Sequence, residues 1–269
     1  MSFINNIFSK LKKKSWGFLL KKQFLKKPSL SYCRKNFLLP QIITATSSEM
    51  LQKMLFLPVS SRTTQENQDF FALIVNQFKP GYFVEIGAND GFTFSNTLYL
   101  EEYFDWSGLL IEANPRYADS LSQRKNVKII NKAISDQSGL AQFVDAGLYG
   151  GLADGIEQQY SHYTDPAPII HVDCLTLQQV FDQASVPMVI DFLSIDVEGG
   201  ELPIVSQLVA DQRRARCGCI EVNHRQWDMD EIKQLLNNAG YKIAWEGMTK
   251  HDLFFIDPLL CPRQTDKKS

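Results

Sequence analysis

The chain has 269 residues, enough for one complete α/β domain with an additional segment. Its hydrophobic fraction of 44% is ordinary for a soluble globular protein, and no apolar run has the length that a membrane span needs. The net charge of −2 hides an asymmetry: residues 1–48 hold ten Lys or Arg and no acidic residue, which leaves 18 of the 28 basic residues with all 30 acidic ones. Because the body of the chain is acidic, we expect no nucleic-acid partner.

Residues 3–27 are predicted to form a basic amphipathic helix, with apolar residues at helical spacing between lysines. Such a helix can lie in an anionic membrane interface, and a solvated extension accounts for the same pattern equally well. We place residues 1–60 outside the folded domain, which is expected at 61–260 and is followed by a polar tail, 261–269. No pair among the five cysteines has zinc or redox spacing, which favours a cytoplasmic protein, with peripheral membrane contact through residues 1–27 left open.

From residue 64 onward, helical and strand patterns alternate along the chain. The predicted helices are 64–78, 95–103, 115–123, 174–184, 201–209 and 228–239, and the predicted strands are 82–86, 108–112, 127–131, 190–195, 218–222, 241–246 and 252–256. Alternation of this kind predicts a mainly parallel, seven-stranded sheet with helices on both faces. Only four residues, 247–250, join the last two strands, so the sheet should end in an antiparallel hairpin. Residues 145–170 are predicted to form a long loop.

Two strand ends carry the layout of a nucleoside cofactor site. The strand 82–86 runs through Glu85 into a loop with Gly87 and Gly91, and the next strand ends at Glu112, whose carboxylate can accept both ribose hydroxyls. The loop lacks the third glycine of a dinucleotide site. A carboxylate at position 85 would repel a pyrophosphate and would suit a cationic ligand, so the charge pattern favours S-adenosylmethionine.

Four segments make the sequence recognisable: 81–91, 95–97, 106–115 and 193–201. Together they resemble the FkbM-type methyltransferases, and the resemblance extends over about residues 62–257. It implies a class I methyltransferase fold, which is Rossmann-like, and transfer of a methyl group from S-adenosylmethionine to an oxygen of a sugar, polyketide or other secondary metabolite. Ala113 stands where many members have proline.

The resemblance also implies roles for particular residues. Glu85, Gly87, Asn89 and Gly91 should surround the methionyl end of the cofactor, and Glu112 should bind the ribose hydroxyls. The remaining expected cofactor residues are Ser95, Asn96 and Thr97 at the methionyl carboxylate, and Ala133 and Ile134 beside the adenine. The same serine and threonine could also cap the following helix.

The expected catalytic residues are Asp196, Glu198 and His224, which all follow predicted strands at the ligand face of the sheet. A carboxylate or the histidine could remove a proton from an acceptor hydroxyl. Alternatively, Asp196 with Glu221 and Asn223 could hold a divalent cation that activates the hydroxyl, although the sequence commits to no metal ligand.

The sequence thus predicts an S-adenosylmethionine-dependent O-methyltransferase that acts by direct displacement on a small-molecule or glycan acceptor, including glycolipids. Two alternatives stay open. One is a nicotinamide-dependent sugar oxidoreductase, which Glu112 would serve equally well. The other is a non-catalytic protein that uses the methyltransferase fold as a scaffold, because fold alone does not decide function.

Overall fold

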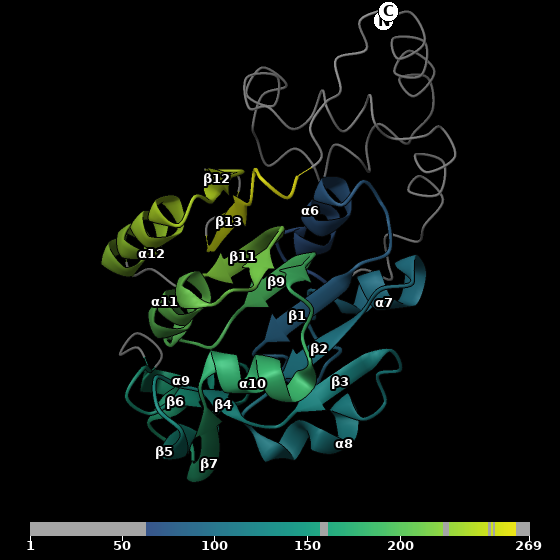
Figure 1. Cartoon of the computed structure of the whole chain (residues 1–269). Helices are drawn as coiled ribbons and strands as arrows, with labels where there is room; N and C mark the ends of the chain where they lie inside the picture. The colour runs from purple at the N-terminus through teal and green to yellow at the C-terminus, as the bar shows by residue number, and fades with distance from the viewer. Residues whose placement is uncertain (1–62, 157–160, 223–225, 247–248, 250, 262–269) are drawn as a thin grey trace, which may run out of the picture. The chain divides into compact units, whose positions relative to one another are not determined.

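The computed structural model describes residues 63–156, 161–222, 226–246, 249 and 251–261, all within one compact unit that spans 45–269. Its centre is a seven-stranded sheet (Figure 1). The strands in chain order are β1 (Tyr82–Ile86), β2 (Ser107–Ile111), β3 (Val127–Ile130), β9 (Phe192–Ile195), β11 (Cys217–Glu221), β12 (Lys242–Ala244) and β13 (Asp252–Ile256).

The spatial order of these strands is β12-β13-β11-β9-β1-β2-β3. The five strands β3, β2, β1, β9 and β11 are parallel, while β13 runs antiparallel to both of its neighbours. The chain therefore starts in the middle of the sheet, builds outward to one edge, and returns to build the other. This arrangement confirms the predicted class I methyltransferase fold with its C-terminal hairpin, and it creates a switch point between β1 and β9.

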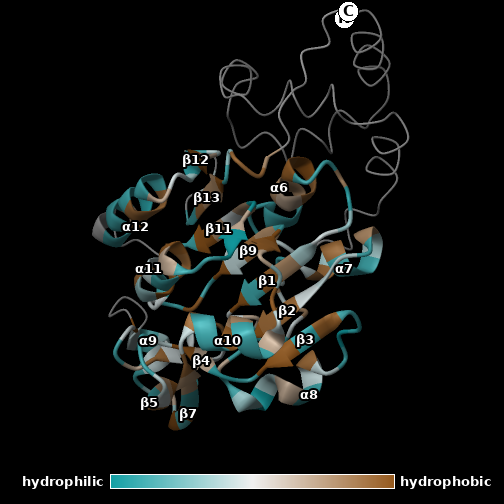
Figure 2. Cartoon of the chain, in the orientation of Figure 1, coloured by the Kyte–Doolittle hydropathy of each residue, from teal (hydrophilic) through white to brown (hydrophobic). Residues whose placement is uncertain are grey.

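Helices cover both faces of the sheet because alternate strand residues are apolar on each side. One face packs against α10 (Leu177–Ala184), α11 (Glu201–Ala210) and α12 (Gln226–Asn238), whose buried residues form one core with β1, β2, β9 and β11. On the other side lie α6 (Gln68–Val75), which contacts β11, and α7 (Leu98–Phe104), which contacts α6. Figure 2 shows that the central strands are mainly hydrophobic, whereas α12 is largely hydrophilic on its visible side.

The long loop predicted at 145–170 is interrupted by short elements, and parts of it belong to a second sheet that the sequence analysis did not predict. Four strands make this sheet in the order β4-β7-β5-β6. They are β4 (Ala133–Ile134), β5 (Gly139–Val144), β6 (Gly151–Leu152) and β7 (Ile169–Leu175), with the turn η3 (Gly147–Tyr149) and the helix α9 (Ser161–Thr164) between them. Most of its pairing partners lie far apart in sequence, and such pairing leaves little local signal.

Smaller deviations have local causes. β7 continues to Leu175, and the helix predicted from 174 therefore begins at 177, where Thr176 and Gln179 form a capping box. The strand predicted at 190–195 is interrupted at Asp191, so that β8 (Val189–Ile190) pairs with β10 (Arg214–Ala215) in a separate two-stranded sheet. The predicted helix 115–123 is a turn, η2 (Pro115–Tyr117), followed by the short α8 (Ala118–Leu121).

Several predictions concern segments outside the described residues. The basic helix at 3–27, its membrane contact and the catalytic assignment of His224 all fall there and stay predictions. Within the part of the chain that the structure describes, no helix is both long and apolar enough to cross a bilayer.

Gly108 allows β1 and β2 to pack closely. A Cβ at this position would lie 2.3 Å from the carbonyl oxygen of Phe83 and 2.4 Å from its ring. We expect Gly108→Ala to lower the free energy of unfolding by about 1–3 kcal/mol, because both neighbours belong to the core. Urea unfolding would measure the loss. Ser107→Ala, at an exposed position of the same strand, should change stability by less than about 0.5 kcal/mol, and equal midpoints for the two variants would contradict this account.

Candidate active site

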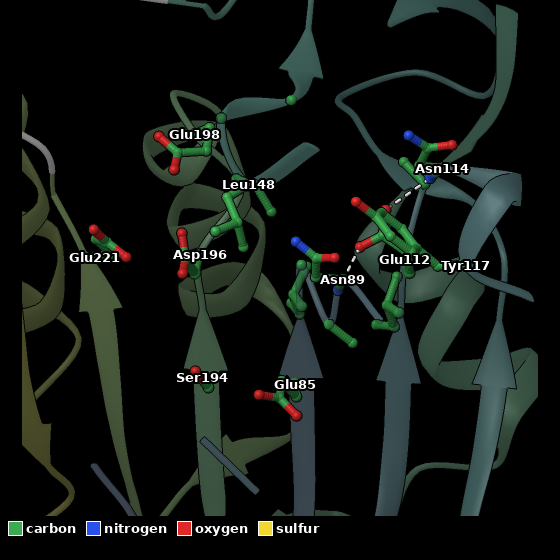
Figure 3. A pocket seen from close by; sticks show the side chains of 18 of the residues that line it. Glu85, Asn89, Glu112, Asn114, Tyr117, Leu148, Ser194, Asp196, Glu198 and Glu221 are labelled. Atoms are coloured by element: carbon green, nitrogen blue, oxygen red, sulfur yellow. Dashed lines mark hydrogen bonds between the residues drawn. The ribbon is translucent and has the colours of Figure 1, made fainter. Parts of the chain in front are cut away.

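A cavity of about 270 Å³ lies at the carboxyl ends of the central strands (Figure 3). Its walls come from the ends of β1, β2, β9 and β11 and from the second sheet. This is the switch point of the sheet, where open α/β folds bind their ligands. Ten residues predicted from the sequence line it: Glu85, Gly87, Asn89, Ser95, Asn96, Glu112, Ala133, Ile134, Asp196 and Glu198.

Glu112 projects from the end of β2 into this cavity, although its side chain is largely buried. One carboxylate oxygen accepts a hydrogen bond from the backbone N–H of Asn89 and the other from that of Asn114, both at 2.7 Å. Burial raises the pKa of Glu112, while these hydrogen bonds oppose the rise. Because a carboxylate oxygen can accept more than one hydrogen bond, both oxygens keep capacity for a vicinal diol.

The loop after β1 depends on residues with a left-handed backbone. Gly87 has a φ of +85°, and a Cβ there would lie 1.6 Å from the carbonyl oxygen of Asp196. No side chain can replace this glycine without parting β1 from β9. Asn89 and Gly91 also have positive φ values, +50° and +80°. Gly91 does not line the cavity, but its conformation shapes the loop that does.

Glu85 lines the cavity and also holds the loop that follows β1. Its carboxylate accepts hydrogen bonds from the Asn96 N–H at 2.7 Å, the Thr97 hydroxyl at 2.6 Å and the Ser95 hydroxyl at 3.0 Å. Burial raises its pKa, and the nearby Arg124 works against this. The sequence argument set Glu85 directly against a cationic ligand, whereas the structure shows it engaged with its own chain.

The three loop residues 95–97 are engaged in hydrogen bonds within the protein. α7 begins after Thr97, which caps it without a side-chain hydrogen bond and does not line the cavity. The Asn96 amide donates to the Ser194 hydroxyl at 2.9 Å. Ser95 and Asn96 remain at the cavity wall, so any contact with a ligand would be added to these internal bonds.

The second sheet supplies the apolar end of the cavity. Ala133 and Ile134 form β4, and Phe143 of β5 lies beside them in the lining. All three side chains are almost fully buried. A flat aromatic base could lie against such a wall, which suits the adenine contact predicted for the first two residues.

Carboxylates gather at the opposite end of the cavity. Asp196 follows β9, and the parallel register of β9 with β11 pairs Ile195 with Ile220, which places Glu221 beside Asp196. The two side chains are hydrogen-bonded, and burial together with Glu221 raises the pKa of Asp196 well above its ordinary value. In Figure 3 both lie on the far side of β1 from Glu112. The sequence treated Glu221 only as a cation ligand, and its position at a strand end was the signal for its pairing role.

The segment after Asp196 is a tight turn. Glu198 has a φ of +55° and Gly199 a φ of +117°. Glu201 closes this turn, because its carboxylate accepts hydrogen bonds from the N–H groups of Val197 at 3.2 Å and Gly199 at 3.1 Å. Glu201 also lies in the first turn of α11, where the helix dipole favours an acid.

Among the described residues, no group of three or more His, Cys, Asp or Glu side chains is placed to hold a metal ion. The predicted divalent cation thus gains no support from these carboxylates. Asn223 and His224 lie outside the described residues.

The second sheet also covers the cavity through the turn η3. Leu148 and Tyr149 line the cavity, and Tyr149 stacks on Tyr163 with ring centroids 4.4 Å apart. A Cβ on Gly151 would lie 3.1 Å from the carbonyl oxygen of Val197, and one on Gly155 would lie 3.0 Å from that of Gly199. These two glycines permit close packing of the second sheet on the Asp196 turn.

Glu201 should make stability depend on pH. Burial raises its pKa from 4.5 to about 7, so the folded state favours the protonated form of Glu201. This preference contributes to the free energy of unfolding at low pH, and the contribution is lost as the pH rises through about 7. Glu201→Gln keeps an acceptor oxygen and removes the charge. We expect equal stability at pH 4 and a variant more stable than wild type at pH 8 by up to about 3 kcal/mol. Urea unfolding at both values would measure this.

Glu231→Gln, at an exposed position on α12, is the matched control and should show no such pH-dependent gain. A Glu201→Gln variant that is equally destabilised at both pH values would contradict the assignment.

Comparisons with known proteins agree with this geometry. The family model described as the methyltransferase FkbM domain matches residues 85–243, more than half of the chain. No curated protein matches the sequence.

Solved methyltransferase structures are similar at low identity. An FkbM methyltransferase from Methylobacillus flagellatus KT has 11% identity and a TM-score of 0.42, covering 77% of this chain and 60% of its own. The METTL16 methyltransferase domain has 12% identity and a TM-score of 0.44, covering 71% and 66%. TYW2 of M. jannaschii, in complex with AdoMet, has 14% identity and a TM-score of 0.37, covering 76% and 80%.

The chain spans less than two thirds of the length of the first two of these structures, and the TM-scores are too low to inform the site. The family match is independent of them. It covers the loop after β1, Glu112 and the Asp196 turn, which are the segments that build the cavity. The chain belongs to the FkbM methyltransferase family.

Proposed function

We propose that the enzyme methylates a hydroxyl oxygen of a sugar, a glycan or a related small molecule by direct displacement. The hydrogen-bonded pair of Asp196 and Glu221 at one end of the cavity carries this proposal. Glu112 lies at the other end, on β2. Since β1 lies between β2 and β9, the strand ends that bear Glu112 and Asp196 are two strand spacings apart, about 10 Å.

The described residues fit S-adenosylmethionine at three points. Glu112 has acceptor capacity for a ribose diol, and Ala133 and Ile134 offer an apolar wall for adenine. Gly87 and Asn89 line the cavity between these two points, where the methionyl chain would lie. When bound, this cofactor supplies an electrophilic methyl group on a sulfonium. The protein has to hold the acceptor oxygen in line with that group and to accept the proton.

Asp196 is the best-placed proton acceptor. It lines the cavity, and burial with the adjacent Glu221 favours its protonated form. A carboxylate with a raised pKa is a stronger base than an exposed one and works closer to neutral pH. In the proposed reaction the acceptor oxygen forms a bond to the methyl carbon, the sulfur–methyl bond breaks, and the hydroxyl proton passes to Asp196.

The surroundings of Asp196 favour an uncharged acceptor. Glu198 and Glu221 also line this part of the cavity, and like charges would repel a phosphate or carboxylate group placed there. Phe94 and Leu148 line the cavity and are 48% and 45% exposed. With Tyr149 they form an apolar rim, and such rims pack well against the faces of sugar rings.

The family match sets aside the nicotinamide-dependent oxidoreductase. A scaffold without catalysis would have no need for the paired carboxylates, whose mutual repulsion and burial destabilise the fold. We therefore favour catalysis over a scaffold role for this protein.

Replacing Glu112 should weaken cofactor binding. In Glu112→Gln the amide NH₂ would face one of the backbone N–H donors of Asn89 or Asn114 and could not accept from a ribose hydroxyl. We expect the Kd for S-adenosylhomocysteine to rise at least about tenfold, measured by titration calorimetry. Glu102→Gln, at an exposed position on α7, should leave the Kd unchanged, and a wild-type Kd for Glu112→Gln would remove this residue from the site.

Replacing Asp196 should separate catalysis from binding. We expect Asp196→Asn to bind S-adenosylhomocysteine with little change and to lose methyl transfer by at least about 100-fold. Because the pKa of Asp196 is raised, the wild-type rate should increase with pH as this group loses its proton. Transfer of label from methyl-tritiated S-adenosylmethionine to a panel of neutral glycosides would measure the loss of rate and its pH dependence, and titration calorimetry would measure binding.

Asp105→Asn, at the exposed end of α7, is the matched control. A wild-type rate for Asp196→Asn, or a rate for the wild-type enzyme that does not vary with pH, would contradict the proposed base.

A further inference from the structure

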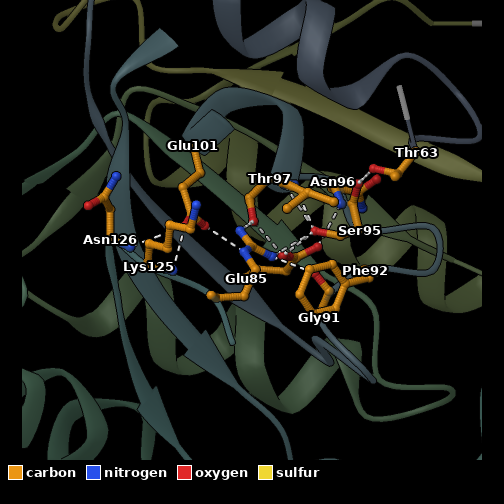
Figure 4. Close-up of polar contacts among 12 residues, drawn as sticks. Thr63, Glu85, Gly91, Phe92, Ser95, Asn96, Thr97, Glu101, Lys125 and Asn126 are labelled. Atoms are coloured by element: carbon orange, nitrogen blue, oxygen red, sulfur yellow. Dashed lines mark hydrogen bonds and ion pairs between the residues drawn. The ribbon is translucent and has the colours of Figure 1, made fainter. Parts of the chain in front are cut away.

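Arg124 is a buried cation beside the loop that follows β1 (residues 87–97, the cofactor loop), and the sequence analysis did not identify it. It lies between α8 and β3, and its side chain is only 1% exposed. Its Nε donates to Glu101 Oε2 at 2.5 Å, and Glu101 in turn accepts from the backbone N–H groups of Lys125 at 2.8 Å and Asn126 at 3.1 Å. The arginine is therefore held on one side by Glu101, which lies near Lys125 and Asn126 (Figure 4).

The other side of the guanidinium reaches the cofactor loop. Nη1 donates to the carbonyl oxygen of Gly91 at 2.6 Å and to the Ser95 hydroxyl at 3.3 Å, and Nη2 donates to the Thr97 hydroxyl at 3.1 Å. These two hydroxyls donate onward to Glu85. One guanidinium thus joins both ends of the segment 91–97 and orients the hydroxyls that satisfy a buried carboxylate.

The loop needs such support because its backbone is strained. Asn89, Gly91 and Phe94 all have positive φ values, +50°, +80° and +57°, and only the glycine adopts this conformation without cost. Asn89 donates its N–H to Glu112, and both residues line the cavity. A change in the path of the loop would therefore reach the ribose end of the site.

We propose that Arg124 is a positioning residue for S-adenosylmethionine, an inference that rests on the proposed function. Arg124 fixes the loop 87–97 in its binding conformation without touching the cofactor. Arg124 itself does not line the cavity. Through Glu101, Lys125 and Asn126 it ties the loop that follows β1 to the segment that leads into β3, so that these two segments keep one relative position.

Arg124→Lys is the test. Lysine keeps the positive charge between the two buried carboxylates, but a single ammonium cannot reach Gly91, Thr97 and Glu101 with the geometry of a planar guanidinium. We expect the Kd for S-adenosylhomocysteine to rise about tenfold, the effect of losing one charge-assisted hydrogen bond. Titration calorimetry measures the Kd of the full chain, and circular dichroism measures its Tm.

A second arginine–aspartate pair, in which Asp257 is buried and Arg214 is 33% exposed, provides the control for a purely structural role. Arg214 bonds to Asp257, which is fully buried, donates to the carbonyl of Ala239 at 3.1 Å and lies over the Tyr241 ring. None of these four residues lines the cavity. We expect Arg214→Lys to lower the Tm as Arg124→Lys does and to bind S-adenosylhomocysteine with the wild-type Kd.

Glu101→Gln provides a milder variant that keeps one acceptor oxygen for the backbone N–H groups. It acts on the cofactor loop only through Arg124, so we expect a folded protein with a Kd raised about threefold. The proposal is overturned if Arg124→Lys binds S-adenosylhomocysteine as wild type does, if Arg214→Lys weakens binding equally, or if folded Glu101→Gln has the wild-type Kd.

Discussion

The buried cluster of Glu85, Arg124 and Glu101 is the interaction on which the cofactor site depends. Two carboxylates and one guanidinium are removed from water here, and such groups are tolerated only when each is paired and hydrogen-bonded. The loop after β1 supplies the partners: two hydroxyls, a backbone N–H and the Gly91 carbonyl. The same hydrogen bonds therefore stabilise the buried charges and fix the conformation of the loop.

A second constraint couples this loop to the carboxylates across the switch point. The contact of Gly87 with the carbonyl of Asp196 leaves no space for a side chain, and the Asp196 N–H donates to the carbonyl of Ile86 at 3.0 Å. The end of β1 and the turn after β9 consequently fix each other. The backbone sets the distance between Glu112 and the paired carboxylates, because the strands that bear Glu112 and Asp196 both pair with β1.

The second sheet gives the cavity its remaining walls. It provides the apolar surface of Ala133, Ile134 and Phe143 and the rim at η3, and close packing of Gly151 and Gly155 seats it on the Asp196 turn. The central sheet thus supplies the carboxylates of the cavity, and the second sheet supplies its apolar surface.

The central strands along the chain, the terminal hairpin and the strand-end positions of Glu112 and Asp196 followed from the sequence, because hydrophobic periodicity and loop length are local properties. Tertiary structure alone decided the rest. The second sheet depends on pairing between distant segments, and Glu221 meets Asp196 only through the register of β9 with β11. The bonds that Glu85 accepts from Ser95, Asn96 and Thr97 form because this segment folds back on it. Arg124 was invisible in the sequence for the same reason: a buried charge is defined by partners that lie far away along the chain.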